Sequence, residues 1–515
     1  MPNLAHVLEQ RAHEVPDRIG LHTEDGRGWT FGELDRLASA TAHALAEHGV
    51  EAGSRVGSYL VNGPELVVVL FASWKLGAVP VTMSSLYNAD ELAGSVAKTA
   101  ADVLVTDDRG LTAALTVRDA VPVLHVGGER PNDVPSLADA RERQEEVLEA
   151  PEMGEDDDAV ILFTGGTTGE PKAVTMTHGG VERALSQLAR ASKGGKPGPY
   201  EMTPESVSPN LVALPLFHSG GQHSFLFAWY VGRSVVLMER FRAAEVARLV
   251  QEHEIDNLFL MPTMLYDLVE HEPALDLSPV RSVLVSGQAL DPTLRARFEH
   301  RFDVPILSNY GATELGHVAG WTARDLREGR WKPGAAGRIY DGVEIEIRDD
   351  EGRALPTGET GEICVRTSIT RGYVDEEGDG GGAQALIEDG WVHSGDVGYV
   401  DEDGVLFLVG RARDMIKCGG FQVWPSELEQ VLNEHPAVAD VAVVAAPHAR
   451  LGEIPKAYVV RADDDRSDEA LAEDLIETTR DRLAHFKAVR EVAFVDELPR
   501  SEAGKIRRGE LAGMS

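Results

Sequence analysis

The chain has 515 residues, and because single hydrophobic cores stop growing near roughly 300 residues, we expect more than one domain. Hydrophobic residues make up 43% and charged residues 26%, a composition that excludes a disordered or fibrous protein. The formal net charge of −36 predicts a surface that repels nucleic-acid backbones and anionic membranes. A polyphosphate would therefore need a local site that opposes the overall field.

The number of cysteines and the lengths of the apolar segments indicate the cellular compartment of the protein. Cys364 and Cys418 are too few for a disulfide framework or a multi-thiolate zinc site. The first 18 residues are amphipathic and charged and lack the continuous apolar core of a signal peptide. No window approaches the ~18 uninterrupted apolar residues that span a bilayer. We expect a cytoplasmic protein without membrane insertion.

Most of the chain alternates helical and strand patterns, which predicts α/β layering. In chain order, the patterns predict a helix opening at Thr30, a strand at 103–106, a helix at 244–252 and strands at 258–260 and 282–286. Two Gly-rich segments, 194–199 and 375–382, are predicted as loops.

After Gly404 the pattern changes to a helix near Pro425, strands at 441–445 and 456–460, a helix at 469–483 and a strand at 492–495. This is a small α+β module of about 100 residues. We therefore predict an α/β protein with a large N-terminal multi-subdomain α/β domain, residues 1–411, and a small mobile α+β C-terminal domain, residues 412–515.

The most informative segment is the loop TGGTTGEPKAV, residues 164–174, which follows an apolar run at 159–163. Glycines let backbone N–H groups turn toward an anion and threonine hydroxyls add donors, so the loop is typical of phosphate binding. It is not a Walker P-loop, because Pro171 precedes Lys172 and no Ser or Thr follows. A flexible surface loop would not explain this composition behind a buried strand.

The loop resembles the signature of the adenylate-forming superfamily, which includes acyl- and aryl-CoA synthetases, amino-acid adenylation domains and luciferases. Gly165 stands where Ser is usual, and Ala173 where Gly is usual. Further family segments follow in the expected order: Pro215 to His218, Ser286 to Leu290, Asn309 to Glu314, Trp391 to Asp396, Gly410 to Asp414 with Lys417 to Gly420, and Pro499 to Ile506. The resemblance covers nearly the whole chain.

The resemblance implies ATP-dependent activation of a carboxylic acid as acyl-AMP with release of pyrophosphate, then transfer to coenzyme A, with Mg²⁺ bound by Glu314. It implies that Lys505 bridges the carboxylate, the ribose and the α-phosphate, that Thr313 donates to the α-phosphate and that His218 positions the acid. The small domain is expected to rotate about Arg413, which brings the Lys417 loop to the site for the second step.

The same resemblance implies a nucleotide site in which Tyr310 stacks on adenine and Asp396 accepts from the ribose hydroxyls beside Arg411. The expected nucleotide-binding set is Thr164, Gly165, Gly166, Thr167, Thr168, Gly169, Lys172, Gly287, Gln288, Ala289, Asn309, Tyr310, Gly311, Asp396 and Arg411. The expected acid pocket is formed by Phe217, His218, Gly220, Gly221, Phe225, Met261, Gly311 and His317, with His223 as a weaker candidate.

The substrate is expected to be a hydrophobic aliphatic or aromatic acid. Amino-acid-activating relatives carry an Asp next to the pocket Phe, whereas here His218 follows Phe217. Alternatives remain open: transfer to a carrier protein or an amine, activation of an unusual small acid, a homodimeric state and, as the weakest alternative, a nucleotide-binding module without catalysis.

Overall fold

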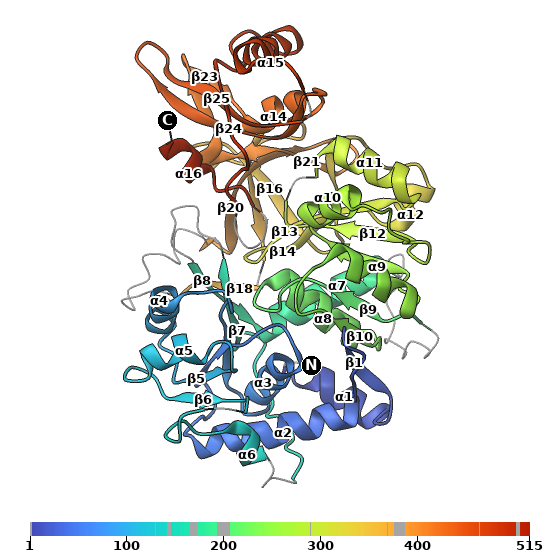
Figure 1. The fold of residues 1–515 in the computed structure, drawn as a ribbon, viewed down its shortest axis with the longest axis vertical. Helices are drawn as coiled ribbons and strands as arrows, with labels where there is room; N and C mark the ends of the chain where they lie inside the picture. The colour runs from blue at the N-terminus through green and yellow to red at the C-terminus, as the bar shows by residue number, and fades with distance from the viewer. Residues whose placement is uncertain are drawn as a thin grey trace.

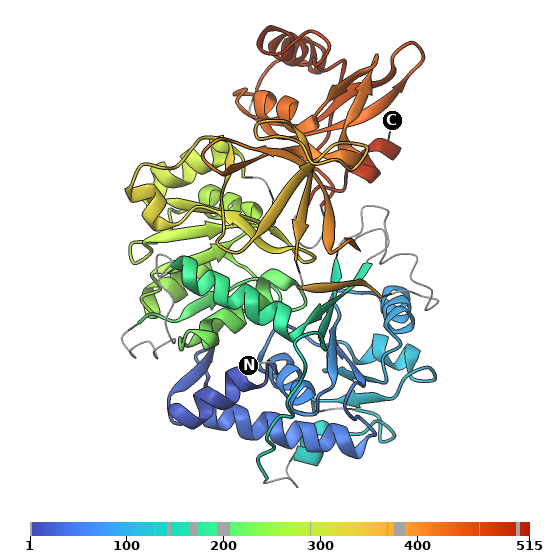
Figure 2. The same ribbon diagram turned by 180° about the vertical axis from the view of Figure 1, so that it is seen from behind.

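The computed structural model describes residues 3–128, 130–141, 146–164, 172–192, 207–288, 290–367, 369–374, 387–462, 464–500 and 505–514. The predicted loops at 194–199 and 375–382, Gly165 to Gly169 and Ala289 lie outside these residues. Figures 1 and 2 show a large body that holds the N-terminus and a smaller C-terminal part at one end of the molecule. Within the described residues, no helix is long and apolar enough to cross a membrane.

A seven-stranded sheet forms one layer of the large body, in the order β18-β8-β7-β4-β3-β5-β6. Strands β3 to β7 are parallel, and β8 and β18 extend the sheet in antiparallel fashion. The strands are β3 (Arg55–Tyr59), β4 (Val79–Thr82), β5 (Val103–Thr106), β6 (Val123–His125), β7 (Asp158–Thr164), β8 (Lys172–Thr177) and β18 (Thr370–Tyr373). The connecting segments include α3 (Pro64–Lys75), α4 (Ala89–Thr99), α5 (Leu111–Ala114), η1 (Leu115–Val117) and α6 (Leu137–Arg141).

A second sheet begins parallel and becomes antiparallel at β13. Its parallel part contains β1 (Ile19–Thr23), β9 (Asn210–Val212), β10 (Val235–Leu237), β11 (Asn257–Leu260), β12 (Ser282–Val285) and β13 (Ile306–Ala312), with β2 (Gly28–Thr30) antiparallel at the edge. Its antiparallel part contains β14 (Gly316–Gly320), β15 (Ala335–Ile339), β16 (Glu344–Arg348), β17 (Gly361–Arg366), β19 (Ile387–Glu388), β20 (Trp391–Val400) and β21 (Val405–Arg411).

Helices pack on these sheets and join them into one core. They are α1 (His6–Glu14), α2 (Phe31–Glu47), α7 (His178–Ser192), α8 (Ser219–Tyr230), α9 (Ala243–Glu252), α10 (Pro262–Glu270), α11 (Pro292–Phe302) and α12 (Ala323–Arg327). One hydrophobic cluster includes Val56 and Val160 from the first sheet and Val235 from the second. The two sheets are therefore parts of one N-terminal body.

The C-terminal sheet is separate and has its own core. It contains β22 (Ile416–Cys418), β23 (Phe421–Val423), β24 (Val438–His448), β25 (Gly452–Arg461) and β26 (Glu491–Phe494), with α14 (Pro425–Asn433), α15 (Asp468–Arg482) and α16 (Arg508–Gly513). The short helix η2 (Ala412–Asp414) links β21 to this part of the chain. Cys364 and Cys418 are both free and buried.

The predicted elements are present where local signals were strong. Thr30 caps α2 in a capping box, since Glu33 N donates to Thr30 Oγ1 at 3.2 Å and Thr30 N donates to Glu33 Oε2 at 2.8 Å. The strand predicted at 441–445 was too short. Pro447 and His448 continue β24 because they pair with Glu453 and Gly452 across a long antiparallel ribbon, a long-range contact without an apolar signature.

Lys75 forms a buried ion network that joins three helices of the large body. Its side chain is 0% exposed, and Nζ lies 2.7 Å from Glu9 Oε1 on α1 and 2.9 Å from Asp35 Oδ1 on α2. Burial raises the pKa of Asp35, whereas hydrogen bonds from Lys75 and His6 outweigh burial and lower the pKa of Glu9. Every residue of α3 from Leu66 to Lys75 is buried, as expected for a helix that is apolar on all sides.

We expect Lys75→Met to lower the free energy of unfolding by about 3–5 kcal/mol, because two enclosed carboxylates lose their cation. Urea unfolding at pH 7 measures this loss. The control is Arg118→Met, since Arg118 and Asp133 form an exposed pair, and such pairs contribute about 0–1 kcal/mol. Equal losses in the two variants would contradict a stabilising role for the buried network.

Candidate active site

The predicted site residues come from three parts of the chain that meet beside the C-terminal segment. β13 ends at Ala312 and is followed by Thr313 and Glu314, while β20 and β21 carry Asp396 and Arg411. In Figure 1, β13, β14 and β20 lie between the C-terminal part at the top and the strands β7, β8 and β18 of the first sheet below. The sheet changes from parallel to antiparallel pairing at β13, so Thr313 and Glu314 follow the end of its last parallel strand.

Tyr310, Asp396 and Arg411 form a hydrogen-bonded group. Tyr310 OH donates to Asp396 Oδ2 at 2.8 Å, and Arg411 Nε lies 2.9 Å from Asp396 Oδ1. The register of β20 and β21 places Asp396 directly opposite Arg411. Burial, and then the charge of Asp396, raise the pKa of Tyr310, so its hydroxyl stays protonated. A carboxylate has about four acceptor sites, so Asp396 retains acceptor capacity for a ribose.

A supporting cluster behind Asp396 was missed by sequence reasoning. Glu362 Oε1 accepts from Gly395 N–H at 3.1 Å, and Glu362 Oε2 lies 2.9 Å from His393 Nδ1. Cys364 Sγ is 3.6 Å from the same nitrogen. Gly395 has φ of +68°, a left-handed conformation that favours glycine. Because Glu362 accepts from the Gly395 N–H, its carboxylate stabilises the turn that leads into Asp396. Neighbouring strands create this cluster, so spacing along the chain gives no signal for it.

Glu314 is linked to the end of the predicted phosphate loop through Tyr373. Tyr373 OH donates to Glu314 Oε1 at 3.3 Å, and Lys172 Nζ lies 4.6 Å from the centroid of the Tyr373 ring. Burial, and then Glu314, raise the pKa of Tyr373, so the phenol stays neutral. Thr164 Oγ1 donates to the Lys172 carbonyl at 3.4 Å, which closes the two ends of the loop. Tyr373 was not predicted, because β18 joins β8 only in the folded sheet.

Thr313 is held by Ser219, a third residue that sequence reasoning missed. The two hydroxyl oxygens are 2.8 Å apart. Ser219 is the first residue of α8, and His218 is its N-cap. The N-terminus of a helix favours an anion because its N–H groups point outward. Burial, and then the charge of Lys505, lower the pKa of His218 to about 4, so this imidazole is neutral near pH 7.

Lys505 lies in the region of these groups, whereas Lys417 lies apart from them on β22. The surrounding protein, and then Arg411, lower the pKa of Lys505, while the carboxylates of Glu314 and Asp396 oppose this shift. Lys505 therefore experiences the charges of both predicted nucleotide-site carboxylates. Lys417 is exposed on β22, and its backbone N–H donates to Glu453 at 2.8 Å.

The predicted acid-pocket residues differ in their surroundings. Phe217 and Met261 are 8% exposed, and a Cβ added at Gly287 would meet Met261 Cε at 3.0 Å. A Cβ at Gly221 or Gly311 would lie 2.1 Å from a backbone oxygen, so close chain packing requires both glycines, whereas Gly220 is less confined. Phe225 is 1% exposed and its ring lies 4.5 Å from that of Trp229, which places it in the aromatic core.

The remaining predicted residues also have defined places. Asn309 uses its side chain within the protein: Nδ2 lies 3.0 Å from Ser286 Oγ and 3.1 Å from His317 Nδ1, and Oδ1 accepts from Tyr340 OH at 3.0 Å. Arg413 lies in η2 and pairs with Asp414 at 3.4 Å. Gly287 has φ of +90° just before Gln288. The nucleotide, pocket, metal and hinge roles of these residues stay predictions.

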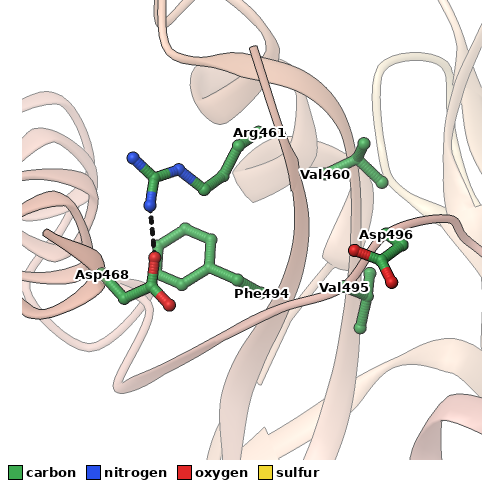
Figure 3. Close-up of a pocket in the computed structure, with 6 residues that line it drawn as sticks. All are labelled: Val460, Arg461, Asp468, Phe494, Val495 and Asp496. Carbon is green, nitrogen blue, oxygen red and sulfur yellow. Dashed lines mark hydrogen bonds and ion pairs between the residues drawn. The ribbon is translucent and has the colours of Figure 1, made fainter. Parts of the chain in front are cut away.

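A surface pocket of about 450 Å³ lies on the small domain, apart from these residues (Figure 3). It is lined by Val460, Arg461, Asp468, Phe494, Val495 and Asp496. Arg461 is already engaged by Asp468, by the carbonyls of Asp464 and Arg466, and by the ring of Phe494. Because the single cation of the described lining is committed and the other charges are acidic, this pocket does not suit a nucleotide.

Comparisons with known proteins agree with the geometry. A family model described as AMP-binding enzyme matches residues 8–374, and one described as AMP-binding enzyme C-terminal domain matches residues 427–505. The chain is 33% identical over 525 aligned residues to 4-coumarate--CoA ligase 5 of Oryza sativa subsp. japonica, covering 99% of this chain and 94% of the relative.

Two solved structures are similar over nearly their whole length. The anthranilate CoA ligase AuaEII in complex with anthranoyl-AMP has a TM-score of 0.88 and 26% identity, covering 99% of this chain and 97% of that chain. The amide bond synthetase McbA from Marinactinospora thermotolerans has a TM-score of 0.85 and 28% identity, covering 99% of each chain.

The chain belongs to the AMP-binding enzyme family, because the first family model alone matches more than half of it. Within that family it is an adenylate-forming ligase of the acyl- and aryl-CoA synthetase type. The predicted α/β fold with a large N-terminal and a smaller C-terminal domain is confirmed.

Proposed function

We propose that this enzyme activates a hydrophobic aliphatic or aromatic carboxylic acid with ATP and transfers the acyl group from acyl-AMP to coenzyme A. The observation that carries this proposal is the position of Lys505, whose pKa responds to Glu314 and Asp396 and whose charge acts on His218. One cation thus lies near the groups assigned to the metal, the ribose and the acid. The relatives named as CoA ligases support coenzyme A as the acceptor.

In the first step, a substrate carboxylate oxygen bonds to the α-phosphorus of ATP and the bond to pyrophosphate breaks. Negative charge develops on the phosphoryl oxygens, so a positioned cation and hydroxyl donors lower the barrier. Lys505 supplies the cation, and Thr313, held by Ser219, supplies a hydroxyl. Neutral His218 orients the acid, and Asp396 accepts from the ribose. In the second step, the coenzyme A thiolate displaces AMP from the acyl carbon.

Glu314 fits a Mg²⁺ ligand. Mg²⁺ is usually bound by one or two carboxylates together with substrate phosphates, and Glu314 lies near the Lys172 end of the predicted phosphate loop through Tyr373. Bound Mg²⁺ would neutralise charge on the phosphates. We also propose that the domain boundary falls after Arg411 and that Arg413 is the hinge, since η2 separates the last strand of the large sheet from β22.

The test is pyrophosphate release with a panel of aliphatic and aromatic acids, measured with coenzyme A, with a primary amine and with neither. We expect acid-dependent pyrophosphate release and rapid turnover only with coenzyme A. Faster turnover with the amine would favour amide formation, the second candidate, which the similarity to an amide bond synthetase supports. Absence of pyrophosphate release with every acid would contradict the proposed function.

Glu314→Gln should weaken Mg²⁺ binding and leave the fold intact. The neutral amide retains an oxygen that accepts from Tyr373 OH but loses the charge that a hard cation prefers. We expect the Mg²⁺ concentration for half-maximal pyrophosphate release to rise by about tenfold, the effect of about 1.4 kcal/mol. The control is Tyr373→Phe, which removes the hydroxyl and keeps the carboxylate. An unchanged Mg²⁺ dependence in Glu314→Gln would contradict the metal assignment.

A further inference from the structure

A buried histidine, His223, and a partly buried one, His317, lie side by side between α8 and β14, next to residues of the predicted acid pocket. The ring centroids of His223 and His317 are 5.6 Å apart, with the planes tilted by 48°. His223 is 6% exposed, and His317 pairs directly across the ribbon with Gly311. Among the described residues, neither Nε2 atom has a hydrogen-bond partner. His218, on the first turn of the same helix, also has a buried Nε2 without such a partner.

Such an arrangement is costly in the free protein. Buried polar atoms in folded proteins are nearly always hydrogen-bonded, and an exception calls for a physical reason. A phenylalanine at either position would fill a similar volume without leaving a polar atom unsatisfied. The cost is recovered if a bound molecule supplies the missing partner. His218 is assigned to the substrate carboxylate, which leaves His223 and His317 for a more distant part of the acid.

Neighbouring side chains determine which ring nitrogen of His317 carries the proton. Asn309 Oδ1 accepts from Tyr340 OH at 3.0 Å, and the amide nitrogen Nδ2 donates to Ser286 Oγ at 3.0 Å. Asn309 Nδ2 lies 3.1 Å from His317 Nδ1, so Nδ1 accepts and the proton of the neutral ring is on Nε2. His317 therefore presents an N–H donor that lacks an acceptor.

The pair is also uncharged near pH 7. Burial lowers the pKa of His223 to about 4, and burial together with the neighbouring His223 lowers the pKa of His317 to about 3. A neutral pair offers no positive charge to a second carboxylate, so dicarboxylic acids are disfavoured. A neutral acceptor, such as an ether, carbonyl or hydroxyl oxygen, matches the donor without requiring charge.

We propose that His223 and His317 form a polar end of the acid pocket and select carboxylic acids that carry a neutral hydrogen-bond acceptor away from the carboxylate. This inference rests on the proposed acid-activating function. His317 Nε2–H donates to the acceptor, and His223 completes the polar surface beside it. Asn309 acts as a positioning residue, because its amide sets the tautomer of His317.

The experiment compares two substituents of similar size on benzoate and cinnamate. The 4-methoxy group supplies an ether oxygen, whereas the 4-ethyl group has a methylene at that place. The measured quantity is the ratio of kcat/KM for pyrophosphate release, methoxy over ethyl. In the wild type we expect a ratio of about ten or more, because a site built to hydrogen-bond a substrate discriminates against an analogue that leaves it unpaired.

Three variants separate recognition from folding. His317→Phe keeps the volume and removes the donor, so the ratio should fall to about one, whereas His317→Gln restores an N–H donor and should recover much of the discrimination. His253→Phe is the control, because His253 forms a similar ring pair with His22 at 5.0 Å and has a buried Nε2 without a hydrogen-bond partner among the described residues. It should leave the ratio unchanged. A ratio near one in the wild type, or an unchanged ratio in His317→Phe, would overturn the inference.

These outcomes are distinct from failure of the proposed function. If no acid produces pyrophosphate, the acid-activating function is wrong and the inference falls with it. If acids are activated but the ratio does not depend on His317, only this inference is wrong. Since the ratio compares two substrates on one variant, a general loss of stability or of active protein does not change it.

Discussion

Lys505→Ala is expected to abolish most acyl-AMP formation while leaving thioester formation from supplied acyl-AMP largely intact. The charges of Glu314 and Asp396 act on Lys505, and the charge of Lys505 acts on His218, so this cation belongs to the region where charge develops as the α-phosphorus is attacked. Removing one contact of this kind typically costs about 10²–10³ in rate. Because the second step breaks the bond to AMP after pyrophosphate has left, it does not need this cation. Pyrophosphate release and acyl-CoA formation from acyl-AMP measure the two steps separately.

Variants of two further lysines, one neutral and one with the opposite expected effect, complete this experiment. Lys456→Ala removes a cation that lies 3.8 Å from Glu491 on the small domain, and both steps should remain near the wild-type rate. Lys417→Ala should show the converse of Lys505→Ala, with normal pyrophosphate release and slow thioester formation. Equal loss of both steps in Lys505→Ala would contradict the division of labour between the two lysines.

Arg413→Pro should slow acyl-AMP formation by about tenfold to a hundredfold. Proline disfavours helical geometry at the preceding residue, and here that residue, Ala412, begins the short helix η2. The arrangement that places Lys505 near Asp396 would then be strained by about 1–3 kcal/mol, and each 1.36 kcal/mol corresponds to tenfold in rate. Thioester formation from supplied acyl-AMP should be less affected if the hinge takes another conformation for that step.

Arg413→Ala is the matched control, since it removes the same side chain and its pairing with Asp414 without restricting the backbone. Equal rates of acyl-AMP formation in the proline and alanine variants would show that the conformation at 412–413 does not control this step. The thermal midpoint of the small domain distinguishes a shifted hinge from an unfolded domain, because unfolding would remove Lys505 and Lys417 together.

Local signals predicted many elements of the fold. The capping box at Thr30 and the apolar periods of the C-terminal helices depend on residues three or four positions apart, so one sequence window contains the whole signal. The ends of β24 depend on pairing with β25, which no local window contains. The joining of both N-terminal sheets into one core depends likewise on long-range packing.

For the site, the sequence by itself determined the family and the order of its segments, because glycines, threonines, Lys505 and Glu314 recur in patterns tied to the chemistry of phosphate and metal binding. The tertiary structure alone decided which groups hold these residues in place. Ser219 binds Thr313, Tyr373 binds Glu314, and Glu362 supports the turn before Asp396. The proton on His317 depends in the same way on the amide of Asn309, eight residues away, whose Nδ2 lies 3.1 Å from His317 Nδ1. Hydrogen bonds act over about 3 Å in space, and only the folded chain brings such distant residues within that range.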